Sequence, residues 1–245
     1  MRSDTGDPVF DFNTLIPMPK ELDIEAGTIT ADSIGYYLSC IDPDNGLVGT
    51  PEQKVSKEEF RKGLSLAAEC KPFPNPRLVN EAEQIDFLKK RYRKDLAWLF
   101  YEGKTRVENL SKHRAADRYQ WCTRERGTKW NAQHTHYDGY TITFDTAWGA
   151  PIPVIRKLGD VHPDLRIGLI YADEDIGNHV GFLLMDHGQI YKEGTFRDKT
   201  RPCYEFAFQL WGGREEYRFD RKNDTYVSKP EKPLKAKETL QAEAA

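Results

Sequence analysis

Residues 121–153 read WCTRERGTKWNAQHTHYDGYTITFDTAWGAPIP and decide the fold. They contain three of the five tryptophans of the chain and a Gly-Thr-Lys-Trp turn. Tyr140–Phe144 is rich in β-forming residues that alternate in polarity, so it predicts a strand. After Pro151, Val154 and Ile155 begin a short apolar repeat at helical spacing, which predicts a helix. A strand followed by a helix therefore opens the C-terminal part of the chain.

The pattern of strands continues beyond this helix. Leu165–Tyr171 and Val180–Met185 are predicted strands, and the turn Asp186–Gly188 leads the second of them into Gln189–Tyr191. The order strand, helix, strand, strand makes up most of a split βαβ unit. The predicted fold class is therefore α+β, with a ferredoxin-like sheet that carries its helices on one face.

Near the C-terminus, Pro202–Leu210 fits both an alternating strand and a helix. We favour the helix, ended by the glycine pair at 212–213. Tyr217–Phe219 and Thr225–Val227 then predict a hairpin. Residues 228–245 are polar and lysine-rich, which predicts a disordered tail.

Upstream, apolar residues recur at helical spacing and predict a helical module over residues 32–118. The expected helices begin at Asp32 or Ser33, at Ser56, at Val79 and at Val107, and the third of them is expected to end at Gly103. The predicted domains are an N-terminal segment packing on the sheet, a helical insertion, a ferredoxin-like domain and a tail, at residues 1–31, 32–118, 119–227 and 228–245.

The N-terminal segment FDFNTLIPMPKEL contains two prolines, which favour an extended chain. The alternation in Phe10–Asn13 predicts a short edge strand. Leu15, Ile16 and Leu22 are expected to attach the segment to a core.

Composition bounds the class of protein. Of 245 residues, 38% are hydrophobic, 31% charged and 12% aromatic, which fits a folded chain with a large surface and an irregular part. Cys40, Cys70, Cys122 and Cys203 lie far apart with no C-x-x-C pair, so we expect reduced thiols rather than a zinc ribbon. The chain starts with no apolar signal region and contains no run long enough to span a membrane. We expect a soluble, cytoplasmic protein.

Three motifs, FNTLIPMPKEL, WC with GTKWNA, and TFDTAWGAPIPVI, resemble the YubB/Api-like family of phage and plasmid proteins. The resemblance covers residues 10–22 and 119–192, with a weaker similarity over Tyr204–Gly212. It implies a ferredoxin-like domain, a mobile-element accessory protein and a bacterial host cell, but no mechanism. Two features depart from the family: a first strand of the Asn-Trp-Cys type is missing, and Arg124–Arg126 replaces Asn-Trp before the Gly-Thr-Lys-Trp turn.

Two groups of residues are candidates for chemistry. His134, His136 and Asp138 alternate, so an extended chain would place them on one face, where they could hold Zn²⁺ or simply form a solvated strand face. The other group could line a pocket or fill the edge of the core, with Asp145 capping the turn or pairing with the lysine. This candidate pocket consists of Lys129, Trp130, Asn131, Asp145 and Trp148, with Thr146 beside them.

Charge is distributed unevenly. Lys89 to Lys129 contains thirteen basic and five acidic residues, a net charge of +8, whereas the whole chain carries −3 and the remainder therefore −11. Such a segment could bind an acidic protein surface, bind phosphates, or be neutralised by the chain's own acidic residues. The residues expected to contact a partner are Lys89, Lys90, Arg91, Arg93 and Lys94.

No Ser-His-Asp, Cys-His, paired-carboxylate or phosphate-loop pattern can be assigned from spacing. We therefore expect neither a catalytic set nor a cofactor. The leading hypothesis is a binding protein of a phage or plasmid that engages a host protein with an acidic surface, in counter-defence. The alternatives are a nucleic-acid-binding module that uses the basic segment, and a metal-dependent enzyme at His134 and His136.

Overall fold

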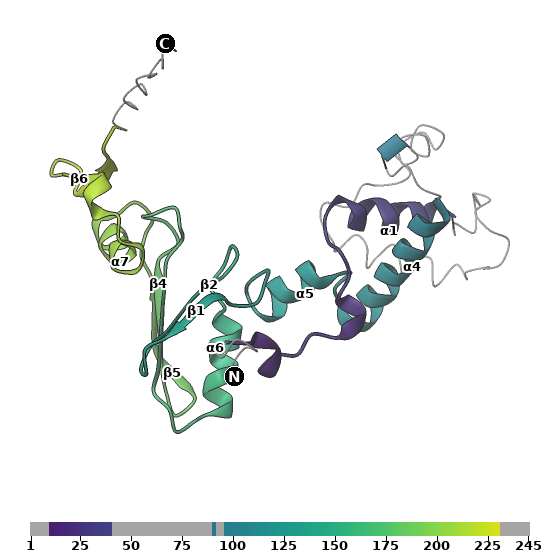
Figure 1. Cartoon of the computed structure of the whole chain (residues 1–245), viewed down its shortest axis with the longest axis horizontal. Coiled ribbons are helices and arrows are strands. Elements are labelled where there is room, and N and C mark those ends of the chain that lie inside the picture. Colours follow the sequence, from purple (N-terminus) through teal and green to yellow (C-terminus); the bar gives the residue numbers. More distant parts are fainter. Residues whose placement is uncertain (1–9, 41–89, 92–95, 231–245) are drawn as a thin grey trace, which may run out of the picture. The chain divides into compact units, whose positions relative to one another are not determined.

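The structure is a computed structural model that describes residues 10–40, 90–91 and 96–230 (Figure 1). It divides into two compact units, Met1–Val161 and His162–Ala245. The predicted helix at Ser56, the start of the predicted helix at Val79 and most of the predicted tail lie outside the described residues. The predicted domain boundaries stay predictions.

Two helices form the helical part of the first unit. Helix α1 spans Thr28–Cys40 and lies beside α4, which spans Leu96–His113 (Figure 1). Their contact buries a common apolar core of Ile34, Tyr37, Leu38, Phe100 and Leu110, as the helical spacing predicts. The start of α1 was predicted wrongly, because Asp32 and Ser33 lie inside the helix and Ser33 is fully buried.

Gly103 does not end a helix, as the sequence suggested, but lies within α4 at its contact with α1. A Cβ atom built on Gly103 would lie 2.0 Å from the Ser33 carbonyl oxygen and 2.5 Å from Cβ of Tyr37. The absence of a side chain therefore lets the two helix backbones approach closely. A sequence alone cannot separate this role of glycine from its role as a helix terminator.

Helix α5, Arg118–Glu125, follows a break after α4 rather than the single helix predicted from Val107 to Tyr119. Asp117 creates this break because its buried carboxylate accepts a hydrogen bond from the backbone N–H of Gln120 at 3.0 Å and one from the Thr30 hydroxyl at 2.6 Å. The side chain thus caps α5 and ties it to α1.

The N-terminal segment forms two 3₁₀ turns, Phe12–Thr14 and Lys20–Leu22, where an edge strand had been predicted for Phe10–Asn13. The reason is local: the Asp11 carboxylate accepts a hydrogen bond from the Asn13 N–H at 2.9 Å and caps the first turn. The predicted attachment through Leu22 is confirmed, since Leu22 is fully buried against Ala115, Trp121 and Cys122, with Ile16 packed beside them.

The remaining elements of the first unit are a hairpin and a helix. Strands β1, Gln133–Tyr137, and β2, Ile142–Asp145, pair antiparallel, and α6, Ile152–Val161, follows. Val154 and Ile155 are buried, as the repeat after Pro151 predicts. The register of the hairpin shifts between Gln133 and His136, which marks a bulge in β1.

The second unit contains the predicted strands, helix and hairpin. Its antiparallel sheet has the order β3-β4-β5, and its last two strands form the hairpin β6-β7. The elements are β3 Ile167–Tyr171, β4 Gly181–Asp186, β5 Gln189–Thr195, α7 Arg201–Trp211, η4 Arg214–Glu216, β6 Tyr217–Asp220 and β7 Thr225–Ser228.

Helix α7 resolves the ambiguity of Pro202–Leu210 in favour of the helix. Cys203 and Ala207 pack against Val180, and Tyr204 and Phe208 pack against Tyr226 of the final hairpin. The helix is favoured because the two residues of each pair, Cys203 with Ala207 and Tyr204 with Phe208, are four positions apart and so lie on the same side of a helix.

No helix among the described residues is both long and apolar enough to cross a bilayer.

We predict that Gly103→Ala destabilises the protein by about 1–3 kcal/mol, the usual cost of overpacking a contact between two backbones. The direction is informative, because helix propensity alone would make alanine the more stable residue by about 0.5–1 kcal/mol. Urea denaturation followed by tryptophan fluorescence measures the change. Thr105→Ala, at an exposed position of the same helix, is the control. A Gly103→Ala variant that is as stable as the wild type would contradict the close-contact role.

Candidate functional site

The two tryptophan-containing motifs of the decisive stretch meet through their backbones. The Thr128 hydroxyl and the Lys129 N–H both donate to the Ala147 carbonyl oxygen, at 2.9 and 3.3 Å. A Cβ atom on Gly149 would lie 2.5 Å from the carbonyl oxygen of Gly127. Only glycine permits this approach, so the Gly-Thr-Lys-Trp and Thr-Ala-Trp-Gly turns form one rigid double turn.

This double turn presents three aromatic rings around one ammonium group. Lys129 Nζ lies 4.3 Å from the ring centroid of Trp148, 4.6 Å from that of Trp130 and 5.9 Å from that of Tyr119 on α5. Tyr119 and Trp148 also contact each other edge to face, with centroids 6.4 Å apart. We call these four residues the Lys129 cluster.

The rings of the Lys129 cluster are exposed to an unusual degree. Trp148 is 79% exposed, Trp130 46% and Tyr119 38%. Trp148 also has φ = 63°, a left-handed conformation that costs a bulky residue about 1–2 kcal/mol. A ring that gains little burial and sits on a strained backbone is explained poorly by packing, which favours a role in binding.

Asn131, which was placed in the same candidate pocket, instead joins the N-terminal segment to the double turn. Its side-chain oxygen accepts a hydrogen bond from the Phe12 N–H at 2.8 Å, and its NH₂ group donates to the Asp11 carboxylate at 2.9 Å. Phe10 and Phe12 pack on the ring of Phe144, at centroid distances of 5.2 and 5.9 Å. Asn131 is therefore an architectural residue.

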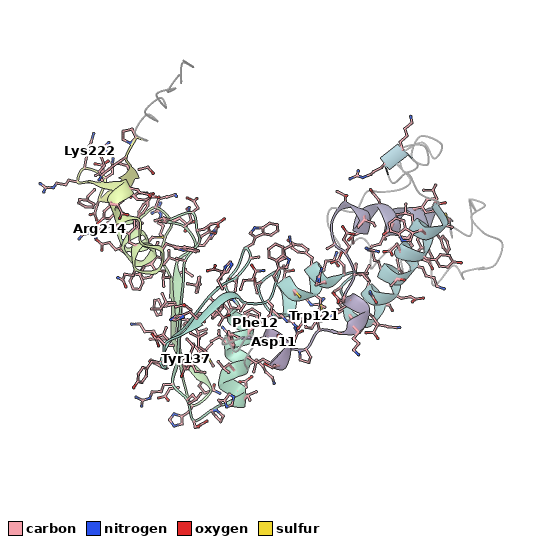
Figure 2. All side chains as sticks on the ribbon, viewed as in Figure 1. Asp11, Phe12, Trp121, Tyr137, Arg214 and Lys222 are labelled. Carbon is pink, nitrogen blue, oxygen red and sulfur yellow. The ribbon has the colours of Figure 1, made fainter. Side chains whose placement is uncertain are left out.

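Arg126 fastens the same segment from the other side. Arg126 as a whole is 3% exposed. Its guanidinium donates to the Ile16 carbonyl oxygen at 2.7 and 3.1 Å and to the Asn13 side-chain oxygen at 2.5 Å, and it stacks 5.1 Å from the Trp121 centroid. Asp11 and Phe12 lie together on the N-terminal segment, and Trp121 lies on α5 (Figure 2). The three sequence motifs thus form one connected body.

The sequence suggested that Asp145 caps the turn or pairs with Lys129, but the structure shows neither contact for its carboxylate. Its carboxylate lies 2.7 Å from Nδ1 of His134. His134 has φ = 48° at the bulge of β1, so His134, His136 and Asp138 do not alternate on one strand face as the sequence suggested. In the part of the chain that the structure describes, no group of three or more His, Cys, Asp or Glu residues is placed to hold a metal ion.

Several arginines of the basic segment have partners within the chain. Lys89, Arg93 and Lys94 lie outside the described residues, and Lys90 and Arg91 are exposed in a helical stretch. Five arginines have internal partners: Arg91 with Asp32, Arg106 with Glu102, Arg118 with Asp23, Arg124 with Glu125, and Arg126 with Ile16 and Asn13. Glu102 and Glu125 belong to the segment and are already counted in its net charge, and the partners of Arg126 are neutral. Of these contacts, only the pairs of Arg91 with Asp32 and of Arg118 with Asp23 support neutralisation by acids outside the segment, and they offset two of its eight excess charges.

Two residues that matter here were missed by sequence reasoning. Tyr119 precedes Lys129 by ten residues, and only the fold of α5 brings its ring to that lysine. Arg126 was noted only as a departure from the family pattern. The available signal was its place directly before a glycine turn, next to two other charged residues, in a stretch otherwise rich in aromatic rings.

We predict that Arg126→Met destabilises the protein by at least about 2 kcal/mol, because it removes the charge-assisted hydrogen bonds of a buried arginine to the Ile16 carbonyl oxygen and the Asn13 side-chain oxygen. Urea denaturation at neutral pH measures the loss. Arg118→Met is the matched control, because its ion pair with Asp23 is exposed and should contribute less than about 1 kcal/mol. Equal losses in the two variants would show that Arg126 is not a fastening residue.

Asp11 predicts a pH dependence. Partial burial opposes ionisation, but hydrogen bonds from Asn13 and Asn131 and the charge of Arg126 outweigh it and hold the pKa of Asp11 below its ordinary value. The contribution of the ionised group to stability is therefore present above an ordinary aspartate pKa of about 3.9 and is lost as the pH falls through the lowered value. Asp11→Asn should lower the free energy of unfolding at pH 7 and make less difference in acid. An equal difference at both pH values would contradict this role.

Residues 127–227 match the model of a protein family described as a ferredoxin-like domain in Api92-like protein. No curated protein and no solved structure matches the chain. The match confirms the α+β, ferredoxin-like fold class and bears out the resemblance at the level of the family. The matched range includes Lys129, Trp130 and Trp148, whereas the N-terminal segment that Arg126 and Asn131 hold precedes it. Over residues 127–227, this chain is thus similar to the ferredoxin-like domain of Api92-like protein.

Proposed function

We propose that the chain is a non-enzymatic binding protein of a phage or plasmid that engages a host protein and counters host defence. The observation that carries the proposal is the Lys129 cluster, three exposed aromatic rings around a lysine on a rigid double turn. The mobile-element setting rests on the resemblance of the three motifs to the YubB/Api-like family. The proposal moves the expected contact from Lys89–Lys94 to this cluster.

Aromatic rings on a fixed backbone are well suited to protein recognition. Tryptophan and tyrosine are enriched among the residues that dominate protein–protein binding, because they bury a large area at a small entropic cost. Here the hydrogen bonds from the Thr128 hydroxyl and the Lys129 N–H to the Ala147 carbonyl oxygen, with the contact between Gly127 and Gly149, fix the turns that carry the rings. Such preorganisation lowers the cost of association.

The alternative of a nucleic-acid-binding module is less well supported. Binding through phosphates needs several cations along a surface, and its affinity rises with their number. The pairs of Arg91 with Asp32 and of Arg118 with Asp23 reduce the net charge that the basic segment offers by two. Exposed rings can also stack on bases, so a nuclease-sensitive partner is an outcome that the experiment must distinguish.

The test is affinity purification of the tagged full-length protein from its host, at two salt concentrations and with nuclease added to half of each sample. We predict that one protein is recovered in stoichiometric amount, survives nuclease and is lost with the Trp148→Gly variant. Glycine adopts φ = 63° without strain, so this variant should fold at least as stably as Trp148→Ala. Tyr191→Ala, which removes a ring that is 66% exposed in the second unit, is the control and should retain the partner.

Three results would change the conclusion. Recovery of nucleic acid alone, lost at high salt, would put the nucleic-acid-binding module in first place. Turnover of a small molecule with no stable partner would contradict a binding protein and favour an enzyme. A protein partner retained equally by Trp148→Gly would keep the binding function and remove the Lys129 cluster from it.

A further inference from the structure

The ammonium group of Lys129 has no carboxylate partner among the residues that the structure describes. Its described partners are the faces of Trp148, Trp130 and Tyr119, with its backbone N–H bonded to Ala147. Asp145, which directly precedes the Thr-Ala-Trp-Gly turn, is engaged with His134. Ring faces attract a cation but do not neutralise it. Among the described residues, the cluster therefore presents a positive charge that no carboxylate neutralises, inside an exposed aromatic surface.

This arrangement contrasts with the arginines around it. Arg118 and Arg124, on the same helix as Tyr119, pair with Asp23 and Glu125. A polyanion such as nucleic acid gains affinity from many cations, and these two already have acidic partners. One localised charge bordered by apolar rings instead complements a single acidic side chain bordered by apolar side chains. The charge of Lys129 and the apolar rings around it therefore both favour a protein segment with one acidic side chain among apolar ones.

Resting on the proposed function, we propose that the Lys129 cluster binds a protein segment that places one carboxylate on Lys129 Nζ and apolar side chains against Trp130 and Trp148. The carboxylate replaces water at the exposed side of the ammonium group, while the rings hold the lysine side chain in place. Desolvation of such a charge pair by surrounding rings strengthens it, so that removal of either partner costs much of the affinity. Tyr119 closes the third side of the lysine and acts as a positioning residue.

The experiment selects ligands without assuming a host partner. A library of random short peptides displayed on phage is panned against immobilised full-length protein and counter-selected against Lys129→Met. Peptides that distinguish the two proteins should carry an Asp or Glu beside apolar residues. One selected peptide is then synthesised with its carboxylate and with the corresponding Asn or Gln, and both are titrated against wild type, Lys129→Met, Trp148→Gly and the control Lys112→Met, which removes an exposed lysine of α4.

The expected result is a double-mutant cycle with strong coupling. Loss of the peptide carboxylate should weaken binding to the wild type and to Lys112→Met by about tenfold or more, and change binding to Lys129→Met little. Trp148→Gly should weaken both peptides. Panning that yields no peptide selective for the wild type, selected peptides without a carboxylate, or a cycle without coupling would overturn the inference. So would a labelled oligothymidylate that displaces the peptide and binds through Trp148.

Failure here is distinguishable from failure of the proposed function. A host protein recovered by affinity purification and retained by Lys129→Met would leave the binding protein intact and remove the carboxylate anchor. A selected acidic peptide together with no recovered host protein would leave the anchor intact and remove the host-protein role.

Discussion

The buried guanidinium of Arg126 is the interaction on which the first unit depends. It lies at the end of α5, directly before Gly127, and donates to Ile16 and Asn13 of a segment more than a hundred residues earlier. Burying a charge is costly unless its donors are paired, so these contacts specify one position for the N-terminal segment. The same residue sets the point from which the Gly-Thr-Lys-Trp turn departs.

The rigidity of the candidate site follows from this arrangement. With the chain fixed on one side of Gly127 by Arg126 and on the other by Asn131, the turn between them has little freedom. The close contact of Gly127 with Gly149 restricts the second turn as well, and therefore the backbone of Trp148. Architectural and binding roles are therefore divided between adjacent residues: Asn131 holds the frame, while Trp130 faces solvent.

Four arginines of the basic segment contribute to the architecture of the first unit. The segment that stood out in the sequence as basic places Arg106 in the core beside Glu102 and Arg126 beneath Trp121, and pairs Arg118 and Arg124 with nearby acids. Arginine suits this role because its planar fork satisfies several acceptors at once. A net charge counted along a sequence overstates the field that a surface offers wherever an acid distant in sequence, such as Asp23 beside Arg118, cancels a charge.

The sequence by itself determined the α+β class, the order of strand, helix and strands, helix α7 with its glycine stop, and the attachment of the N-terminal segment through Leu22. These features follow from periodicity and turn residues, which act over a few neighbouring positions. It also identified Lys129, Trp130 and Trp148 as members of one group. It could not separate their role from that of Asn131, because neighbours in sequence face different surroundings.

Only the tertiary structure decided the features that depend on contacts between distant segments. The sequence suggests that Gly103 ends a helix, whereas the structure shows that it allows α1 to approach α4 closely. Asp145 pairs with His134 rather than Lys129 because of a bulge in β1. Tyr119 joined the Lys129 cluster, and Arg126 became a buried fastening residue, only when α5 and the N-terminal segment were in place. Local pattern fixes which elements form, whereas the choice of partner for each charge and each glycine is made by packing across the chain.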